Sequence, residues 1–223
     1  MKIEPPDRDR GARASIYNGL TLRVYDLAVL GLTNSLIWRC PTKRLVEHYR
    51  KHVGPAHLDI GPGTGYYLER IDACSISLLD LNDSSLNAAA ERIGSQAEVR
   101  PLRQSFFDAL DSNLVFDSIG LNFLLHCIPD TSKWNRLAEL REHLAPGGTI
   151  FGSTVIPDRT EENAAAVVLN GIYNHLGVFG NCDDATADIT NALQGLSHVQ
   201  VDRVGQVVMF AAQKPRPMDR EEP

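Results

Sequence analysis

Three glycines at alternate positions, Gly61, Gly63 and Gly65, are the first residues of this sequence whose spacing points to chemistry. They follow an apolar run at residues 57–60, which is typical of a buried strand, and they precede a segment with helical spacing. Glycine adopts backbone angles that other residues avoid, and it lets a ligand lie directly against the main chain. We therefore expect a ligand crevice here, beyond the carboxyl end of the strand.

A carboxylate stands at the end of the next predicted strand, residues 76–79. Asp80 follows Gly61 by about 20 residues, the distance at which an acidic residue of such folds binds the ribose hydroxyls of a nucleoside. Together the two features predict an adenosine-type ligand. The simpler alternative is a solvated aspartate beside a tight strand–helix turn.

The residues around the glycines discriminate between nucleoside ligands. The third glycine of a dinucleotide-binding loop would fall on Tyr66, and the Gly-Lys-Ser/Thr of a phosphate loop is missing. Asp59 precedes the turn, and its charge would repel a pyrophosphate but attract an ammonium or sulfonium group. These observations favour S-adenosylmethionine over NAD. The sequence also lacks the Tyr-xxx-Lys expected of a nicotinamide-dependent oxidoreductase.

Four segments resemble the motifs of the class I S-adenosylmethionine-dependent methyltransferases: LDIGPGTG at 58–65, LLDLN at 78–82, FDSIGLNFLLHCIP at 116–129 and LAPGGTIFGSTV at 144–155. The likeness is to small stand-alone bacterial and fungal enzymes that act on metabolites, and it covers about residues 41–213. It implies transfer of a methyl group from S-adenosylmethionine to a small-molecule acceptor, such as a secondary metabolite, with S-adenosylhomocysteine as product.

The resemblance also implies which residues hold the methyl donor. Asp59 and the three glycines would hold its methionine part, Asp80 would bind its ribose, and Asn122 would lie near its methyl group. The remaining predicted donor contacts are Leu81, Ser105 and Phe106 beside the adenine and Tyr17 from the N-terminal segment.

Methyl transfer is an in-line displacement, so positioning in a water-poor pocket can supply much of the acceleration. A base is needed only for an acceptor that arrives protonated, such as a phenol or carbon acid. His126 is the leading candidate for this base, because an ordinary histidine pKa is near neutral; a packing role is the alternative. Tyr25 and His175 are further catalytic candidates, and Asp26 and Trp38 are other candidate pocket residues.

Strand and helix patterns alternate along the chain and would position these residues. Alternation predicts an α/β fold with a mostly parallel sheet and helices on both faces. The link between the last two strands is too short for a crossover, so the final strand must run antiparallel. The predicted strands are 57–60, 76–79, 98–102, 116–123, 149–155, 198–203 and 206–212, and the predicted helices are 15–32, 42–52, 64–71, 84–93, 131–144, 161–174 and 183–193. The family resemblance specifies the same architecture: a Rossmann-like seven-stranded sheet with an antiparallel last strand.

The predicted organisation is a tail at 1–14, an N-terminal helical cap at 15–55, the donor-binding domain at 56–213 and a second tail at 214–223. The chain has 22 Lys and Arg against 28 Asp and Glu, for a net charge of -6. This acidic balance disfavours nucleic-acid and anionic-membrane partners, and no apolar stretch reaches the roughly 18 residues of a membrane span.

The four cysteines form no CxxC pattern, so we expect no metal site and four reduced, mostly buried thiols in a cytoplasmic protein. One functional alternative remains open at this level. A protein of the same fold could bind the donor and catalyse a non-transfer reaction, such as a pericyclization, or serve as a scaffold. The donor motifs would look the same.

Overall fold

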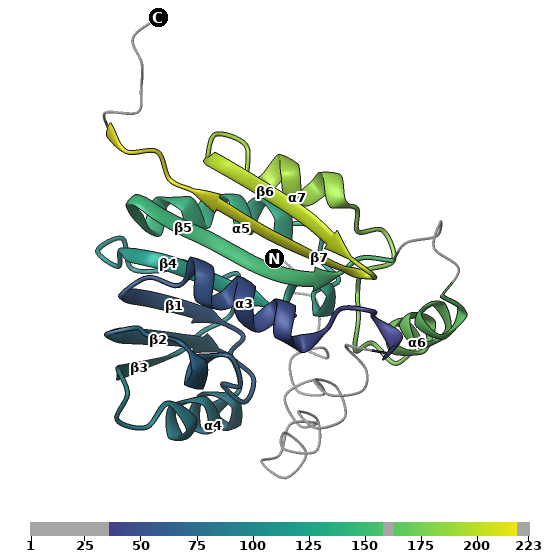
Figure 1. The fold of residues 1–223 in the computed structure, drawn as a ribbon, viewed down its shortest axis with the longest axis horizontal. Helices are drawn as coiled ribbons and strands as arrows, with labels where there is room; N and C mark the ends of the chain where they lie inside the picture. The colour runs from purple at the N-terminus through teal and green to yellow at the C-terminus, as the bar shows by residue number, and fades with distance from the viewer. Residues whose placement is uncertain (1–35, 158–162, 218–223) are drawn as a thin grey trace, which may run out of the picture.

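A seven-stranded sheet forms the centre of the part of the chain that the computed structural model describes, residues 36–157 and 163–217. Its strand order is β3-β2-β1-β4-β5-β7-β6 (Figure 1). The strands are β1 (Ala56–Ile60), β2 (Ser75–Asp80), β3 (Glu98–Arg103), β4 (Phe116–Asn122), β5 (Leu144–Val155), β6 (Ser197–Val204) and β7 (Val207–Gln213). Strands β1 to β5 run parallel, with β1 between β2 and β4. The predicted Rossmann-like, mostly parallel sheet is confirmed.

The last two strands form the hairpin that the short link predicted. Val204 pairs with Val207, so the turn holds only Gly205 and Gln206. Gly205 has a φ of +59°, and a Cβ there would lie 2.2 Å from the carbonyl oxygen of Trp38. Strand β7 runs antiparallel to both β5 and β6. The prediction of an antiparallel last strand is therefore confirmed.

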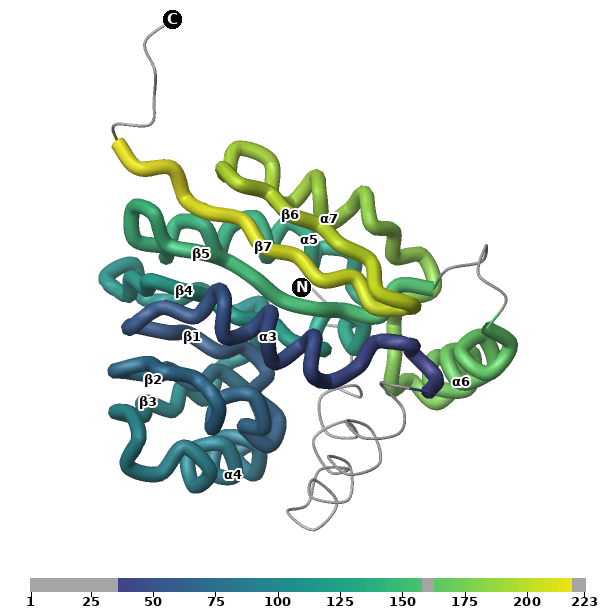
Figure 2. Tube along the Cα trace, in the orientation of Figure 1, coloured from purple at the N-terminus to yellow at the C-terminus, as the bar shows by residue number. Residues whose placement is uncertain are grey.

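Helices cover both faces of the sheet, and Figure 2 shows α3 in front of it with α5 and α7 behind. Tyr49 of α3 and Leu86 of α4 pack with Phe151 in the core of one face. Leu137 of α5 and Ile189 of α7 belong to the core of the other. The helices are α3 (Thr42–His52), α4 (Asp83–Ile93), α5 (Lys133–Glu139), α6 (Ala164–His175) and α7 (Thr186–Ala192), with 3-10 turns η2 (Leu68–Arg70), η3 (Leu125–Cys127) and η4 (Leu140–His143).

The helix predicted at residues 64–71 is wrong, because only the 3-10 turn η2 forms there. Gly63 and Gly65 have φ angles of +56° and +73°, which lie outside the α-helical region. The glycine loop therefore continues through Gly65. The predicted helix at 42–52 matches α3 residue for residue.

The helix predicted at 131–144 is too long, and the strand predicted at 149–155 begins too late. The helix α5 ends at Glu139 and gives way to the 3-10 turn η4. The Ala-Pro-Gly-Gly segment at 145–148, predicted to stop the helix, lies inside β5, with Gly147 at a φ of +81°. The pairing of β4 with β5 shifts register between Phe116 and Ser118, which accommodates the extra residues.

The described part of the second predicted tail is attached to the sheet. The backbone N–H of Lys214 donates to the carbonyl oxygen of Gly148 at 2.8 Å, and its Nζ donates to that of Leu144 at 2.8 Å. The predicted tail at 1–14, the helix at 15–32 and residues 218–223 lie outside the described residues. No helix within the described ranges is long and apolar enough to cross a membrane.

The four cysteines are all free thiols, but the prediction that they are mostly buried is wrong. Cys40 alone is buried; Cys127 is partly accessible, and Cys74 and Cys182 are exposed. Burial raises the pKa of the Cys40 thiol to about 11, so it stays protonated.

Candidate functional site

The glycine loop follows β1 directly. Two different physical requirements explain why glycine occupies its three positions. A Cβ on Gly61 would lie 3.0 Å from Cδ1 of Leu124, and a Cβ on Gly65 would lie 2.8 Å from the Cα of Ala89. These two positions are closed by packing. Gly63 also has a positive φ, but a Cβ there would meet nothing within 4 Å among the described atoms. Gly63 therefore leaves the main chain open at the position where a ligand can approach it.

Asp80 ends β2, next to the carboxyl end of β1. Its Oδ1 accepts the backbone N–H of Asn82 at 2.9 Å, and burial raises the pKa of its carboxyl group. The side chain of Asn82 in turn caps α4 by accepting the backbone N–H of Ser84. Helix capping thus fixes the turn that presents Asp80 at the crevice.

Two buried side-chain amide nitrogens at the strand ends lack a hydrogen-bond acceptor among the described residues. They are Nδ2 of Asn82, after β2, and Nδ2 of Asn122, at the end of β4. Oδ1 of Asn122 accepts from the hydroxyl of Ser153 at 2.8 Å, which orients the amide. A buried donor without an acceptor costs about 1–3 kcal/mol. Both atoms flank β1 and fit a ligand that brings acceptor groups, as the adenosine and carboxylate parts of S-adenosylmethionine do.

Asp59 is the penultimate residue of β1, just before the glycine loop, and is 4% exposed. Burial, followed by the nearby charge of Asp80, raises the pKa of its carboxyl group to about 8. Two acidic groups so close together are costly in an empty crevice and favourable beside a cation. The carboxylates therefore suit a donor that carries positive charge.

The residues predicted to contact the adenine have different surroundings. Leu81 is 54% exposed beside Asp80 and is free to pack on a ligand. The hydroxyl of Ser105 accepts the backbone N–H of Phe107 and so stabilises its own turn. The ring of Phe106 is buried in the core. The three side chains thus do not form one surface, and their roles stay predictions.

His126 lies on η3, after β4, and is 3% exposed. Its Nδ1 accepts the backbone N–H of Val155 at 3.3 Å and also lies 3.3 Å from the hydroxyl of Thr154. Burial, followed by the charge of Lys133, lowers the pKa of the imidazole to about 3. Because Nδ1 is an acceptor, the proton of the neutral ring lies on Nε2. This arrangement favours packing or hydrogen-bond donation, and the role of general base stays a prediction.

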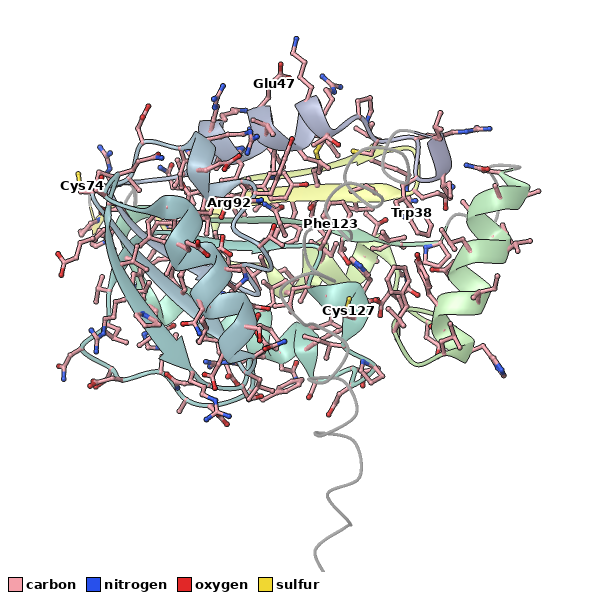
Figure 3. The ribbon with its side chains drawn as sticks, turned by 90° about the horizontal axis from the view of Figure 1, so that it is seen from below. Trp38, Glu47, Cys74, Arg92, Phe123 and Cys127 are labelled. Atoms are coloured by element: carbon pink, nitrogen blue, oxygen red, sulfur yellow. The ribbon has the colours of Figure 1, made fainter. Side chains whose placement is uncertain are left out.

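Aromatic rings surround His126 and form a wall beyond β4 and β5. The centroid of the Phe179 ring lies 4.4 Å from that of the His126 imidazole and 6.0 Å from that of the Trp38 ring. The centroid of the Phe123 ring lies 5.7 Å from that of the imidazole. Phe123 has a φ of +53°, an unusual value for a non-glycine residue at the end of a strand. Figure 3 shows Trp38, Phe123 and Cys127 toward the end of the molecule that carries α6, with Cys74 at the opposite end.

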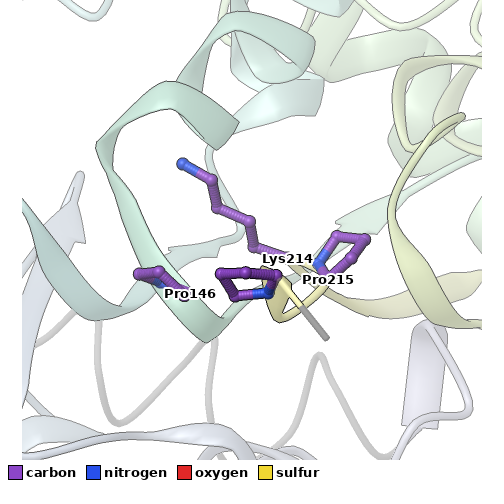
Figure 4. Close-up of a pocket in the computed structure, with 4 residues that line it drawn as sticks. Pro146, Lys214 and Pro215 are labelled. Carbon is purple, nitrogen blue, oxygen red and sulfur yellow. The ribbon is translucent and has the colours of Figure 1, made fainter. Parts of the chain in front are cut away.

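A hollow of about 170 Å³ opens beside this wall, at the carboxyl end of β5. Its lining is mostly apolar and consists of Trp38, Val155, Pro157, Ala166, Val167, Asn170, Gly171, Cys182 and Gln206. A second pocket, of about 380 Å³, is formed by Pro146, Lys214, Pro215 and Pro217 (Figure 4). It adjoins the amino end of β5, the opposite edge of the sheet from the glycine loop, and has no part in the candidate site.

The remaining predicted residues do not join this arrangement. His175 ends α6 and is exposed, and no hydrogen bond or ring contact among the described residues links it to His126. Tyr17, Tyr25 and Asp26 lie outside the described residues. Asp59, Asp80 and Asn122, which are predicted to bind the donor, thus lie at the ends of β1, β2 and β4. The rings of His126 and Trp38 both contact Phe179.

Sequence reasoning missed three polar residues behind Asp59, namely Tyr49, His57 and Ser118. All three are nearly inaccessible, and they join Asp59 in one hydrogen-bonded cluster. One signal was present in the sequence: His57 and Asp59 lie two residues apart in an otherwise apolar strand, so they share a face of the sheet. Polar residues at such positions need partners.

Comparison with known proteins identifies relatives over almost the whole chain. A family model described as a methyltransferase domain matches residues 58–150. Methyltransferase aurB of Calcarisporium arbuscula is 36% identical over 220 residues, which cover 90% of this chain and 96% of that protein. The Physcion biosynthesis cluster O-methyltransferase of Aspergillus chevalieri is 32% identical over 227 residues, which cover 96% and 99%. Human N-acetylserotonin methyltransferase, solved in complex with S-adenosylmethionine, has a similar fold: its TM-score is 0.62 at 18% identity, over 92% of this chain and 59% of that one.

Proposed function

The chain belongs to the class I S-adenosylmethionine-dependent methyltransferases, and from this premise we propose that it methylates a small, largely apolar metabolite. The observation that carries the proposal is the arrangement at the carboxyl end of β1. There the main chain is open at Gly63, and the carboxyl groups of Asp59 and Asp80 lie close enough for the charge of one to raise the pKa of the other. S-Adenosylmethionine supplies a methyl carbon bonded to a cationic sulfur, and its departure leaves S-adenosylhomocysteine.

The protein's part in the reaction is to bind and orient the donor and to exclude water. Asp59 would bind the ammonium group of the methionine part, and Asp80 the ribose hydroxyls. The side-chain NH2 groups of Asn82 and Asn122 would donate to hydrogen-bond acceptors on S-adenosylmethionine. This would remove the cost of two buried donors that have no partner among the described residues. Leu81 would pack on the adenine.

The residues beyond the ends of β4 and β5 support a small aromatic or aliphatic molecule as the methyl acceptor. The rings of Trp38, Phe123 and Phe179 and the apolar hollow at the end of β5 offer stacking and apolar contact, with few charges. Nucleic acid is disfavoured by the net charge of -6 and by Asn-Phe-Leu-Leu at 122–125, where enzymes that methylate base amino groups carry Asn-Pro-Pro-aromatic. The named relatives include an O-methyltransferase of a biosynthesis cluster, which supports a secondary metabolite.

The division of the chain and its cellular location belong to the same proposal. Residues 56–213 would form the donor-binding domain and residues 15–55 a cap over the acceptor, between tails at 1–14 and 214–223. One part of the predicted cap, α3, packs on the face of the sheet at β5 and β7. Four free cysteines and the absence of a membrane-spanning helix in the described ranges support a cytoplasmic enzyme.

A labelled methyl group tests the proposed reaction. The protein is incubated with S-adenosylmethionine labelled at its methyl carbon and a panel of phenols, amines and carbon acids. Label on an acceptor supports transfer. Tight donor binding with no label on any acceptor would instead favour a donor-binding protein with a non-transfer reaction.

Asp80→Ala tests the donor site in the same protein. The variant should bind S-adenosylmethionine about 1–3 kcal/mol more weakly, since it loses a hydrogen-bonded charged contact. Asp72→Ala is a matched control, because Asp72 is an exposed carboxylate upstream of the same strand. Equal donor affinity of the two variants in calorimetry would refute the ribose assignment.

A further inference from the structure

Behind the donor crevice lies a buried hydrogen-bonded chain from three elements of the fold. The backbone N–H of Gly54 donates to Oγ of Ser118 at 2.7 Å, and this Oγ lies 2.8 Å from Nδ1 of His57. Nε2 of His57 lies 3.0 Å from the Tyr49 hydroxyl and 3.3 Å from Oδ2 of Asp59. The Tyr49 hydroxyl donates to the same oxygen. His57 is 0% and Tyr49 1% exposed, so solvent does not complete this network.

One arrangement of protons fits the contacts in this network when Oδ2 of Asp59 is an acceptor. The Tyr49 hydroxyl has one proton and gives it to Asp59, so it cannot also donate to His57. Nε2 of His57 must therefore carry the ring proton and point it at Tyr49 and Asp59. Nδ1 is then an acceptor, and the proton it accepts comes from the hydroxyl of Ser118. This arrangement places the ring proton on Nε2, and burial lowers the pKa of His57 to about 3, which keeps the imidazole neutral.

The hydrogen-bonded network ends on one oxygen, Oδ2, of the Asp59 carboxyl group. Among the described residues, both of its hydrogen-bond partners reach Oδ2, which leaves Oδ1 for a ligand. Gly120 on β4 makes room for this arrangement. A Cβ at that position would lie 3.0 Å from Cε1 of His57 and 3.3 Å from Oδ2 of Asp59.

We propose that Tyr49, His57 and Ser118 are positioning residues, which hold Oδ2 of Asp59 so that Oδ1 faces the ammonium group of the methyl donor, and that donor binding expels a proton from Asp59 to solvent. The proposal rests on the proposed function, because it takes the donor to be S-adenosylmethionine. It deepens that function by adding three residues and a proton to the binding step.

The groups around Asp59 explain why a proton is present before the donor binds. Burial and the nearby Asp80 raise the pKa of Asp59 to about 8, whereas the two donors on Oδ2 favour its charged form. The other titratable groups from the elements packed here are His57 on β1, Tyr49, His48 and His52 on α3, and Tyr67, which stacks on Tyr49, in the glycine loop. β4 contributes Gly120 and β5 contributes Phe151. No described cation balances the two carboxylates, so a cationic ligand fills that role.

The sign of the pH effect follows from proton linkage. A group whose pKa falls on binding releases a proton, so affinity rises with pH below the pKa of the free protein. With a free pKa of about 8 for Asp59, donor affinity should rise up to tenfold per pH unit between about pH 5.5 and 7. The donor's own amino group stays largely protonated in this window, since an ordinary α-amino pKa is about 7.7–8.0.

Calorimetry in buffers of different ionisation enthalpy counts the protons released on donor binding. The full-length protein should release close to one proton per S-adenosylmethionine at pH 6. Asp59→Asn should release none and should lose the pH dependence of affinity. Tyr49→Phe removes one hydroxyl from Oδ2 and should weaken binding about tenfold at pH 7 while moving the sloping region to higher pH. Ser77→Ala is the matched control, since Ser77 is a buried hydroxyl opposite Leu58, on the other face of the sheet.

Three results would overturn the proposal. They are the absence of proton release in the natural protein, the same release in Asp59→Asn, and a Tyr49→Phe variant with unchanged affinity and pH dependence. A purely structural Tyr49 would change the free energy of unfolding and leave the pH dependence of affinity as it is. Nitrogen NMR of the free protein gives a test that needs no donor: His57 must show the Nε2–H tautomer. A protein that fails to bind the donor but shows this tautomer would refute the proposed function and leave the network standing, whereas the Nδ1–H tautomer would refute the network.

Discussion

Lys133→Met should remove a large part of the stability of this protein. The Lys133 side chain is 0% exposed, and its Nζ donates to Oδ2 of Asp184 at 2.7 Å. It also donates to the carbonyl oxygens of Ile128 at 2.8 Å, Leu125 at 3.0 Å and Gly180 at 3.4 Å. One ammonium group thus joins α5 to the turn that carries His126 and to the segment before α7. Methionine keeps the apolar stem and removes the charge.

The cost can be bounded in two ways. Removing one partner of a buried ion pair typically costs about 3–5 kcal/mol. The Asp184 side chain is 4% exposed, so without Lys133 it must stay charged in the interior or take up a proton. Protonating a carboxyl group of ordinary pKa at pH 7 costs about 4 kcal/mol, because three pKa units cost about 1.36 kcal/mol each. We therefore expect a loss of about 4 kcal/mol in the free energy of unfolding at pH 7.

The same reasoning fixes how the loss depends on pH. In the variant the folded pKa of Asp184 lies above its unfolded value, so the penalty is absent below the unfolded pKa and grows as pH rises. It should shrink to about 1.5 kcal/mol at pH 5. Urea unfolding at both pH values measures this difference. Lys43→Met is the matched control, because the Lys43 side chain is 86% exposed, and its pair with Glu47 should be worth under about 0.5 kcal/mol.

Adding Asp184→Asn to Lys133→Met should restore part of the lost stability, because the double variant has no unpaired buried charge. A Lys133→Met variant within about 1 kcal/mol of the natural protein at pH 7 would refute the reasoning, and so would a penalty that stays constant with pH.

Four further variants test the site. Gly63→Ala should block the donor and cost about 1–2 kcal/mol of stability, because alanine is strained at a φ of +56°. Gly65→Ala should cost more, because it carries the same strain and its Cβ would also meet the backbone of Ala89. Calorimetry and urea unfolding separate the effects on binding and on stability. Gly120→Ala should weaken donor binding about tenfold in calorimetry, since its Cβ presses on Asp59. His126→Ala should lower turnover more than donor affinity in a steady-state assay, and unfolding should show a loss of about 1–3 kcal/mol from the unpaired N–H of Val155; full turnover would remove His126 from the reaction.

The strands along the chain and the position of Asp59 and Asp80 at strand ends could be predicted because they depend on short segments. An apolar run of four to eight residues identifies a buried strand, and parallel strands bring their carboxyl ends to one edge of the sheet. The rule places Asp59 and Asp80 at that edge, whereas the predicted role of Asn122 came from the family resemblance. The helix at 64–71 could not be excluded, because a helical hydrophobic pattern does not reveal the positive φ angles that Gly63 and Gly65 adopt. The early start of β5 depends on its pairing with β4 and β7, which the local sequence does not contain.

The network behind Asp59 was hidden for a different reason. Tyr49, His57 and Ser118 belong to a helix and two strands. Their polar atoms meet only because α3 packs on the sheet with Tyr49 at His57, and because β1 pairs with β4 at His57 and Ser118. Yet the sequence held a sign of it, because a histidine and an aspartate on one face of a buried strand conflict with the apolar pattern that makes the strand. Natural sequences accept such conflicts mainly at functional sites. A buried charge with no cation beside it stabilises nothing in the free protein. Asp59 is therefore best explained by a positively charged ligand, and the three residues behind it by the need to aim one oxygen at that ligand.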